Sequence, residues 1–214
     1  MKKYLLLLFS NMSLILLAQE PGNNQSAWGF ALGMETQTLG IESLDRHKPM
    51  ESLVSSGQNQ LGMTMGINYR KIIWRGLAFE PGLFFSYNRN KVNFSPGSQE
   101  RFQFVDIELP LHLSVTNQKS GTFPVRGKIL FGARTSWNFF QNPAEKLRFL
   151  PERLGLDLGL GVAIHCDKWI IYPEVVYSHG INNIHDFTGT EYDYFVGQAV
   201  RDKLAFRLLF ERNK

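Results

Sequence analysis

The sequence predicts an all-β protein: an eight-stranded antiparallel up-and-down transmembrane β-barrel with long extracellular loops and short periplasmic turns. Eight segments alternate apolar and polar residues with period two, which is typical of strands that have one apolar face. The connections between them alternate in length, as they do when one barrel end faces outside and the other faces the periplasm. After the N-terminal segment, no apolar run approaches the roughly 20 residues that a transmembrane helix requires.

The N-terminal segment has the features of a cleaved secretory signal. Lys2 and Lys3 precede an apolar run, and Ala18 lies just before polar residues. We therefore expect residues 1–18 to be a signal peptide and residues 19–214 to form the outer-membrane barrel domain. An uncleaved membrane anchor is the alternative, although the apolar run is short for a span.

The first four strands are expected at residues 28–35, 61–70, 78–87 and 105–114. The polar stretches 36–59 and 88–101 are expected to be long loops, and residues 72–76 a short turn. Pro81 and Pro110 interrupt two of these strands. Because proline cannot donate to the hydrogen-bond ladder, we expect a bulge at each, and another at Pro173.

The last four strands are expected at residues 126–138, 154–165, 169–178 and 203–211. Their connections are 116–123, 140–153, the tight turn 167–168 and the long loop 179–201. The strand 154–165 is the clearest, because Leu154, Leu156, Leu158 and Leu160 alternate with glycines and Asp157. Such a segment is long enough to cross a bilayer at a steep tilt.

Alternation alone does not say which face is inside, and a lipocalin-like soluble barrel would place its apolar face inward. Here the polar face is rich in glycine and in charges of both signs, which suits the narrow interior of an eight-stranded barrel. Aromatic residues also fall near both strand ends, as in the girdles at lipid headgroups. The periplasmic girdle comprises Trp28, Tyr69, Trp169 and Phe210, and the outer girdle comprises Tyr87, Trp137 and Tyr177. We therefore predict a membrane barrel in the cell outer membrane, in contact with its lipid.

The charged residues of the polar face predict a structural network in the barrel lumen. Neighbouring strands carry opposite charges, which favours cross-strand ion pairs, and a buried charge without a partner is costly. The expected network comprises Arg70, Glu80, Asp106, Glu108, Arg126, Lys128, Arg134, Asp157, Glu174 and Arg207. We interpret it as a plug that keeps a narrow barrel closed; the alternative is an ion or solute path.

The histidines do not lie in a pattern typical of catalysis or metal binding. His112 and His165 are expected to hydrogen-bond in the lumen, because no nucleophile elbow or metal-ligand spacing accompanies them. His179 and His185 fall in a predicted loop with Asp186, which leaves open a site there. We expect no enzyme activity, cofactor, metal, small-molecule substrate or nucleic-acid partner.

Residues 187–195 form an aromatic-rich segment in the last predicted loop. Its aromatic side chains are Phe187, Tyr192, Tyr194 and Phe195. Exposed aromatic loops are frequent recognition surfaces, so this one is a candidate partner loop. A loop that folds over the barrel mouth would have the same composition, and the sequence leaves both interpretations open.

Four segments resemble the PorT-like outer-membrane barrel family of Bacteroidetes. They are residues 79–83 (FEPGL), 107–111 (IELPL), 159–161 (GLG) and 172–183 (YPEVVYSHGINN). The resemblance covers nearly all of the chain after the signal, and the last segment is its most specific part. It implies an accessory role in type IX secretion, with motility in gliding members, through contacts with other secretion-system proteins. It implies no catalytic residues.

The function expected from the sequence is thus a non-enzymatic outer-membrane barrel, an accessory of type IX protein secretion. The fold follows from the residues, whereas the secretion role follows from the resemblance. One alternative is a stand-alone structural or adhesion barrel. A further alternative is a membrane-embedded barrel enzyme.

Overall fold

A computed structural model describes residues 26–43, 54–74, 76–94, 98–117, 125–140, 147–187 and 196–212. All regular elements among them are strands. Their bounds are β1 (Ser26–Ser43), β2 (Val54–Asn59), β3 (Leu61–Trp74), β4 (Leu77–Phe94), β5 (Ser98–Thr116), β6 (Val125–Asn138), β7 (Arg148–Phe149), β8 (Glu152–His165), β9 (Trp169–Gly180), β10 (His185–Asp186) and β11 (Val196–Arg212). The expected signal peptide, residues 1–18, lies outside the described residues. The described residues contain no helix that is long and apolar enough to span a bilayer.

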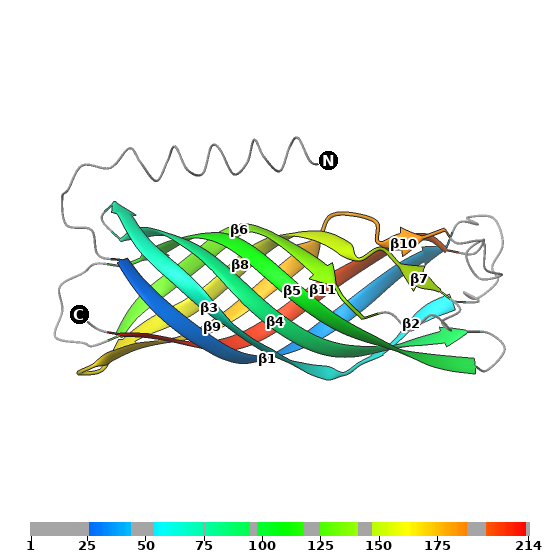
Figure 1. Cartoon of the computed structure of the whole chain (residues 1–214), viewed down its shortest axis with the longest axis horizontal. Coiled ribbons are helices and arrows are strands. Elements are labelled where there is room, and N and C mark those ends of the chain that lie inside the picture. Colours follow the sequence, from blue (N-terminus) through cyan, green and yellow to red (C-terminus); the bar gives the residue numbers. More distant parts are fainter. Residues whose placement is uncertain are drawn as a thin grey trace.

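Eight strands form a closed antiparallel ring in the order β1, β3, β4, β5, β6, β8, β9 and β11. The ring closes where β1 pairs with β11, from Gly29 opposite Glu211 to Ser43 opposite Val196. The short strand β2, which precedes β3 in the chain, pairs with the part of β4 that extends past the first residue of β3. The strands are long and tilted, and β1 begins at the same end of the barrel at which β11 ends (Figure 1). The predicted up-and-down eight-stranded barrel is confirmed.

We call the two ends of the barrel the turn end and the loop end. The turn end carries Ser26, Arg212 and the connections β3–β4, β5–β6 and β8–β9. The β3–β4 turn contains Gly76, whose φ of 90° lies in the left-handed region that favours glycine. The loop end carries the other connections, together with β2, β7 and β10 (Figure 1).

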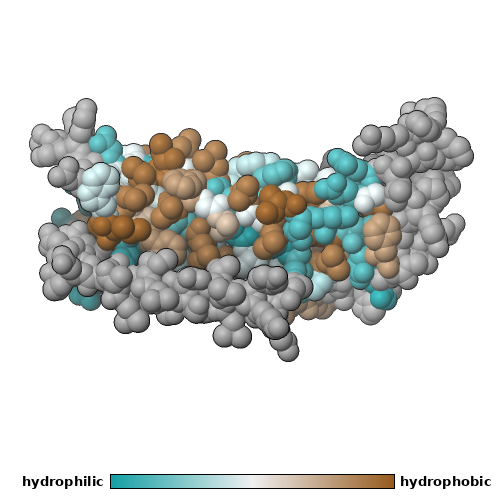
Figure 2. Space-filling view, turned by 90° about the horizontal axis from the view of Figure 1, so that it is seen from above, coloured by the Kyte–Doolittle hydropathy of each residue, from teal (hydrophilic) through white to brown (hydrophobic). Residues whose placement is uncertain are grey.

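The outer face of the ring is an apolar belt. Leu154, Leu156, Leu158 and Leu160 are each about half exposed, whereas Asp157 between them is buried. Brown, apolar side chains gather on the part of the visible surface nearer the turn end, and hydrophilic ones predominate nearer the loop end (Figure 2). The predicted direction of the two faces is therefore confirmed. A soluble lipocalin-like barrel would show the reverse.

Several strands are longer than predicted at the loop end. Residues 36–43, 88–94, 98–101 and 196–201 are expected from the sequence to be loops, and they are strand. In these extensions the apolar side chains face inward, as Leu39, Val92 and Phe102 do, while their neighbours face out. The polarity of the two faces is thus reversed beyond the belt. The prediction failed there because it required apolar residues on the outer face.

The prediction of bulges at the three prolines is wrong. Register is constant on both sides of Pro81, from Asn68 opposite Gly82 to Lys71 opposite Phe79, although the two pairs between are missing from the ladder. Pro110 and Pro173 likewise keep a constant register with their partner strands. Proline removes one donor, and the closed ring holds the register through the pairs on either side.

Candidate functional site

The barrel interior is filled by charged side chains, and those nearest the turn end form a first layer. Lys128 Nζ lies 2.7 Å from Glu80 Oε2 and 2.6 Å from Glu174 Oε1. Arg70 pairs with Glu211 at 3.2 Å and contacts the hydroxyl of Tyr172. The Lys128 ammonium also lies over the Tyr172 ring, 4.7 Å from its centroid. Every cation of this layer therefore has at least one carboxylate partner.

Arg134 organises the middle layer. Its Nη2 and Nε lie 2.7 and 2.9 Å from Asp157 Oδ2, and its Nη1 contacts Glu108. Glu108 also accepts from Lys203 Nζ, at 2.6 and 2.7 Å from its two oxygens. His112 Nε2 lies 2.6 Å from the same Asp157 oxygen. This is the lumen hydrogen bond expected for His112.

Close backbone contact between β5 and β6 supports the middle layer. A Cβ added at Gly132 would lie 2.1 Å from the carbonyl oxygen of Leu111 and 2.8 Å from the Cα of His112. Real Cβ atoms do not approach so closely, so only glycine fits. Gly132 lies opposite both His112 and Asp157 in the sheet. It therefore allows the strands that carry these two side chains to approach.

A third layer lies toward the loop end. Arg201 pairs with Asp106, and its guanidinium lies over the Phe104 ring, 4.4 Å from the centroid. Arg153 donates from Nη2 to Ser178 Oγ at 3.3 Å, while its Nε and Nη1 have no hydrogen-bond partner. Arg153 is buried, so two of its nitrogens lack a hydrogen bond in a site away from solvent.

Among the residues that the structure describes, the interior cations and carboxylates are equal in number. The cations are Arg70, Lys128, Arg134, Arg153, Arg201, Lys203 and Arg207, and the carboxylates are Glu35, Glu80, Asp106, Glu108, Asp157, Glu174 and Glu211. Many pairs join strands that are not neighbours, such as Lys203 on β11 with Glu108 on β5. Such pairs cross the lumen, which is possible only because the ring is narrow. The charges therefore balance within the barrel and link its opposite walls.

All but one of the residues predicted for the lumen network make an ion pair in the interior. The prediction for Arg126 is wrong. Arg126 is two residues before Lys128 and so belongs to the same face of the strand, but it lies exposed at the start of β6, where the barrel opens. Among the described residues Arg126 makes no ion pair. Position along the strand, and not only parity, decides whether a charge is inside.

The sequence prediction also missed five members of the network. They are Glu35, Arg153, Arg201, Lys203 and Glu211. Lys203 and Glu211 lie on the predicted inner face, so parity already indicated them. Glu35 ended a predicted strand, and Arg153 and Arg201 fell in segments expected to be loops. Their inward orientation could be assigned only once the structure showed that these segments belong to strands.

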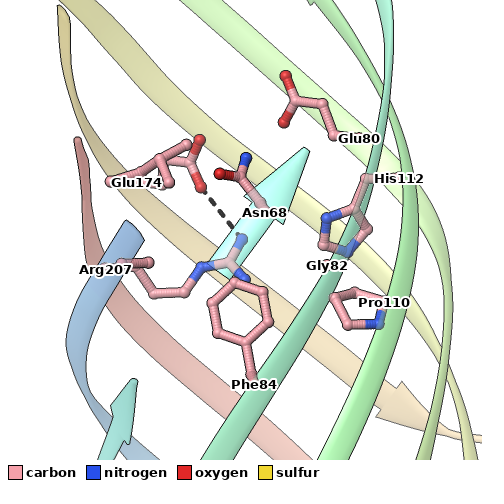
Figure 3. A pocket seen from close by; sticks show the side chains of 10 residues that line it. Asn68, Glu80, Gly82, Phe84, Pro110, His112, Glu174 and Arg207 are labelled. Atoms are coloured by element: carbon pink, nitrogen blue, oxygen red, sulfur yellow. Dashed lines mark hydrogen bonds and ion pairs between the residues drawn. The ribbon is translucent and has the colours of Figure 1, made fainter. Parts of the chain in front are cut away.

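A small cavity lies between the first and middle layers. Its volume is about 10 Å³, the space that one water molecule requires. Its walls include Phe84, His112 and the ion pair of Arg207 with Glu174, whose atoms are 3.1 Å apart (Figure 3). Asn68 Oδ1 and Arg207 Nε lack hydrogen-bond partners beside it. The side chains that line this cavity therefore leave room for about one water molecule between the two layers.

An apolar cap closes the interior at the loop end. It comprises Leu39, Val92, Phe102, Phe104, Leu147, Phe149, Ile184, Val196 and Ala199. Phe149 of β7 packs edge-on against Phe102, with ring centroids 5.3 Å apart. β7 pairs with β10, and the Leu150 amide donates to the Ile184 carbonyl at 2.6 Å. The cap thus consists of inward-facing strand residues and of two connecting segments that fold over them.

Only the first residue of the predicted partner loop falls in the described part of the chain. Phe187 is 60% exposed, and its ring lies against that of His185, 4.3 Å between centroids. Tyr192, Tyr194 and Phe195 lie outside the described residues. The two interpretations of this loop therefore both remain predictions.

The histidines expected in that loop lie in strands. His179 belongs to β9, and its Nδ1 is 3.0 Å from Asp202 Oδ1 at the exposed surface. Tyr177 donates to the other Asp202 oxygen at 3.0 Å. His185 and Asp186 form β10, apart from this pair. No group of three or more His, Cys, Asp or Glu among the described residues has metal-binding geometry.

Comparison with known proteins shows the fold. The outer membrane protein OprG from Pseudomonas aeruginosa superposes with a TM-score of 0.53 at 12% identity, covering 88% of this chain and 96% of that chain. Neisserial surface protein A gives a TM-score of 0.46 at 12% identity, covering 86% and 97%. No protein-family model and no curated protein sequence matches the chain.

The fold and the belt together assign the chain to a class of protein. A closed barrel leaves no free strand edge, and this one exposes apolar side chains where a membrane would contact them and keeps its charges inside. The chain has the fold of the outer-membrane barrel OprG over most of its length. It is therefore an eight-stranded β-barrel of the cell outer membrane.

Proposed function

We propose that this barrel is a non-enzymatic accessory of type IX protein secretion that acts through contacts at its ends. The observation that supports this is the filled interior: three layers of ion pairs and an apolar cap occupy the lumen. A filled lumen provides no route for a solute, so the surfaces that remain for function are the rims. The proposal of type IX secretion as the system rests on the resemblance of residues 172–183 to the PorT-like family.

The surface that we propose for partner contact is an apolar rim at the loop end. It comprises Phe139, Phe140, Leu150, Ile181 and Phe187, all of them exposed. The Ile181 amide donates to the Leu154 carbonyl at 3.0 Å and the Leu150 amide to Ile184, so these segments are joined in one rim along β6, β8 and β9. Exposed aromatic groups of this kind favour protein contacts.

The experiment is deletion of the gene, followed by comparison of secreted proteins that carry the cleavable C-terminal domains of type IX cargo. We expect those cargoes to accumulate inside the cell and to reappear outside on complementation with the wild type. Complementation with a triple variant, Phe139→Ser, Phe140→Ser and Phe187→Ser, should fail. A matched control, Leu156→Ala in the belt, should restore secretion. An unchanged set of secreted proteins after deletion would refute the proposal.

A second candidate is an adhesion or structural barrel, which the long strand extensions favour. β4, β5, β1 and β11 continue well past the apolar belt and would project a rigid wall from the membrane. In that case deletion would leave secretion unchanged and would reduce attachment of cells to surfaces. The same deletion strain therefore separates the two functions.

A further inference from the structure

The belt is not uniform: it has a hollow on the outer face near the turn end. The hollow has a volume of about 220 Å³ and is lined by Trp28, Ile67, Tyr69, Pro81, Gly82 and Leu83. These residues come from β1, β3 and β4, and the lining is almost wholly apolar. Trp28, Ile67 and Leu83 are exposed, so the hollow opens to whatever surrounds the belt.

The sequence explains why the hollow exists. Pro81 occupies an outward position on β4 between two longer side chains, Tyr69 on β3 and Leu111 on β5, and the ladder with β3 lacks the two pairs beside it. The ring of Tyr69, which would face Pro81, instead contacts Trp28 on the other side, 5.0 Å between centroids. A short side chain and a neighbour turned away leave the space between β3 and β4 unfilled.

A cation lies beside the hollow, on the side nearer the turn end. Lys71 is the next outward-facing residue of β3 after Tyr69, and it lies opposite Ser26 and Phe79. Among the described residues Lys71 makes no ion pair. Lysine extends along apolar surface and keeps its ammonium group at the headgroup level, and the aromatic pair of Trp28 and Tyr69 occupies the same level.

We propose that this hollow binds one phospholipid of the periplasmic leaflet. A segment of an acyl chain would fill the space beside Pro81 and Leu83, and the phosphate would lie near the Lys71 ammonium. An apolar slot with a free cation at its headgroup end matches both parts of a phospholipid. This proposal is independent of the role in secretion.

The test is native mass spectrometry of the full folded chain in detergent, titrated with dioleoyl phosphatidylglycerol. We expect binding of one lipid to saturate. Leu83→Trp, which fills the hollow, should abolish it, and Lys71→Gln should weaken it about fivefold, the effect of one basic residue near an anionic headgroup. The matched controls are Leu158→Trp in the belt and Lys168→Gln in the β8–β9 turn, and neither should change binding.

Folding of each variant is checked by its faster migration on gels before boiling. If Leu83→Trp does not fold, Pro81→Leu fills the same space and restores a backbone donor. Lipid binding to the wild type that does not saturate at one molecule would overturn the proposal. So would a folded hollow-filling variant that binds as the wild type does.

Discussion

Arg134 makes more ionic contacts in the middle of the barrel than a single pair requires. Its guanidinium joins Glu108 on β5 to Asp157 on β8, and Glu108 in turn holds Lys203 from the opposite wall. All four groups are almost fully buried. Removal of one cation would therefore leave carboxylates without enough positive charge in a site that water does not reach.

We predict that Arg134→Met lowers the free energy of unfolding by about 3–5 kcal/mol, the usual cost of breaking a buried ion pair by removing one partner. Urea unfolding of the barrel in lipid vesicles measures this. The control is Arg126→Met at the exposed start of β6, which we expect to change stability by less than about 0.5 kcal/mol. Equal effects for the two variants would show that the interior pairs do not stabilise the fold.

Most of these side chains could be assigned to the lumen from the sequence, because successive side chains of a strand point to opposite faces of the sheet. Lys128, Arg134 and Asp157 are examples. Which partner each would take was not predictable. Pairs such as Arg201 with Asp106 cross the lumen, so they depend on the stagger of distant strands and not on neighbouring residues.

Strand β8 is the element in which the apolar belt is clearest, and it was also the best predicted. Leu158 is 60% exposed at its centre, opposite Phe131 and Tyr177 on the two adjacent strands. We predict that Leu158→Arg costs about 2–4 kcal/mol of stability in lipid vesicles, because the charge would lie near the middle of the bilayer. Gln103→Arg, on the exposed face of the β5 extension, is the control and should have little effect. A neutral Leu158→Arg would contradict the membrane assignment of this face.

Strands β7 and β10 were absent from the prediction. Each has two residues, and their stability comes from Phe149 and Ile184 packing into the cap rather than from any local pattern. The strand extensions at the loop end were also not predicted, because their apolar side chains face inward and their polar ones outward. The prediction looked for strands with apolar residues on the outer face. A segment with inward apolar residues such as Phe102 does not meet that criterion.

The cap is expected to open separately from the barrel. Phe149→Ala removes ring contacts with Phe102 and Phe104, and a loss of about 3 kcal/mol corresponds to a roughly hundredfold rise in local opening. Hydrogen exchange of the amides of Leu150 and Ile184 should quicken accordingly, while β8 and β6 amides keep their protection. Phe187→Ala, at an exposed position, should leave the rate unchanged. Uniform loss of protection would mean that cap and barrel unfold together.

As a whole, the molecule is an outer-membrane barrel with two differently built halves. In the belt, apolar residues face out and balanced charges fill the lumen; beyond the belt, apolar residues face in and form the cap. The interior is therefore filled in both halves, by ion pairs within the belt and by apolar side chains beyond it. This sealed interior is the reason for placing function at the rims.

The most direct test of the sealed interior is ion conductance of the folded full chain in planar lipid bilayers. We predict no stepwise current above that of the protein-free bilayer, because the ion-pair layers and the cap leave room for about one water molecule in the cavity between the first and middle layers. The folded state of the protein added to the bilayer is verified by its faster migration on gels before boiling. Reproducible single-channel steps from folded protein would contradict a closed lumen, and a solute path would then replace contacts at the rims as the basis of function.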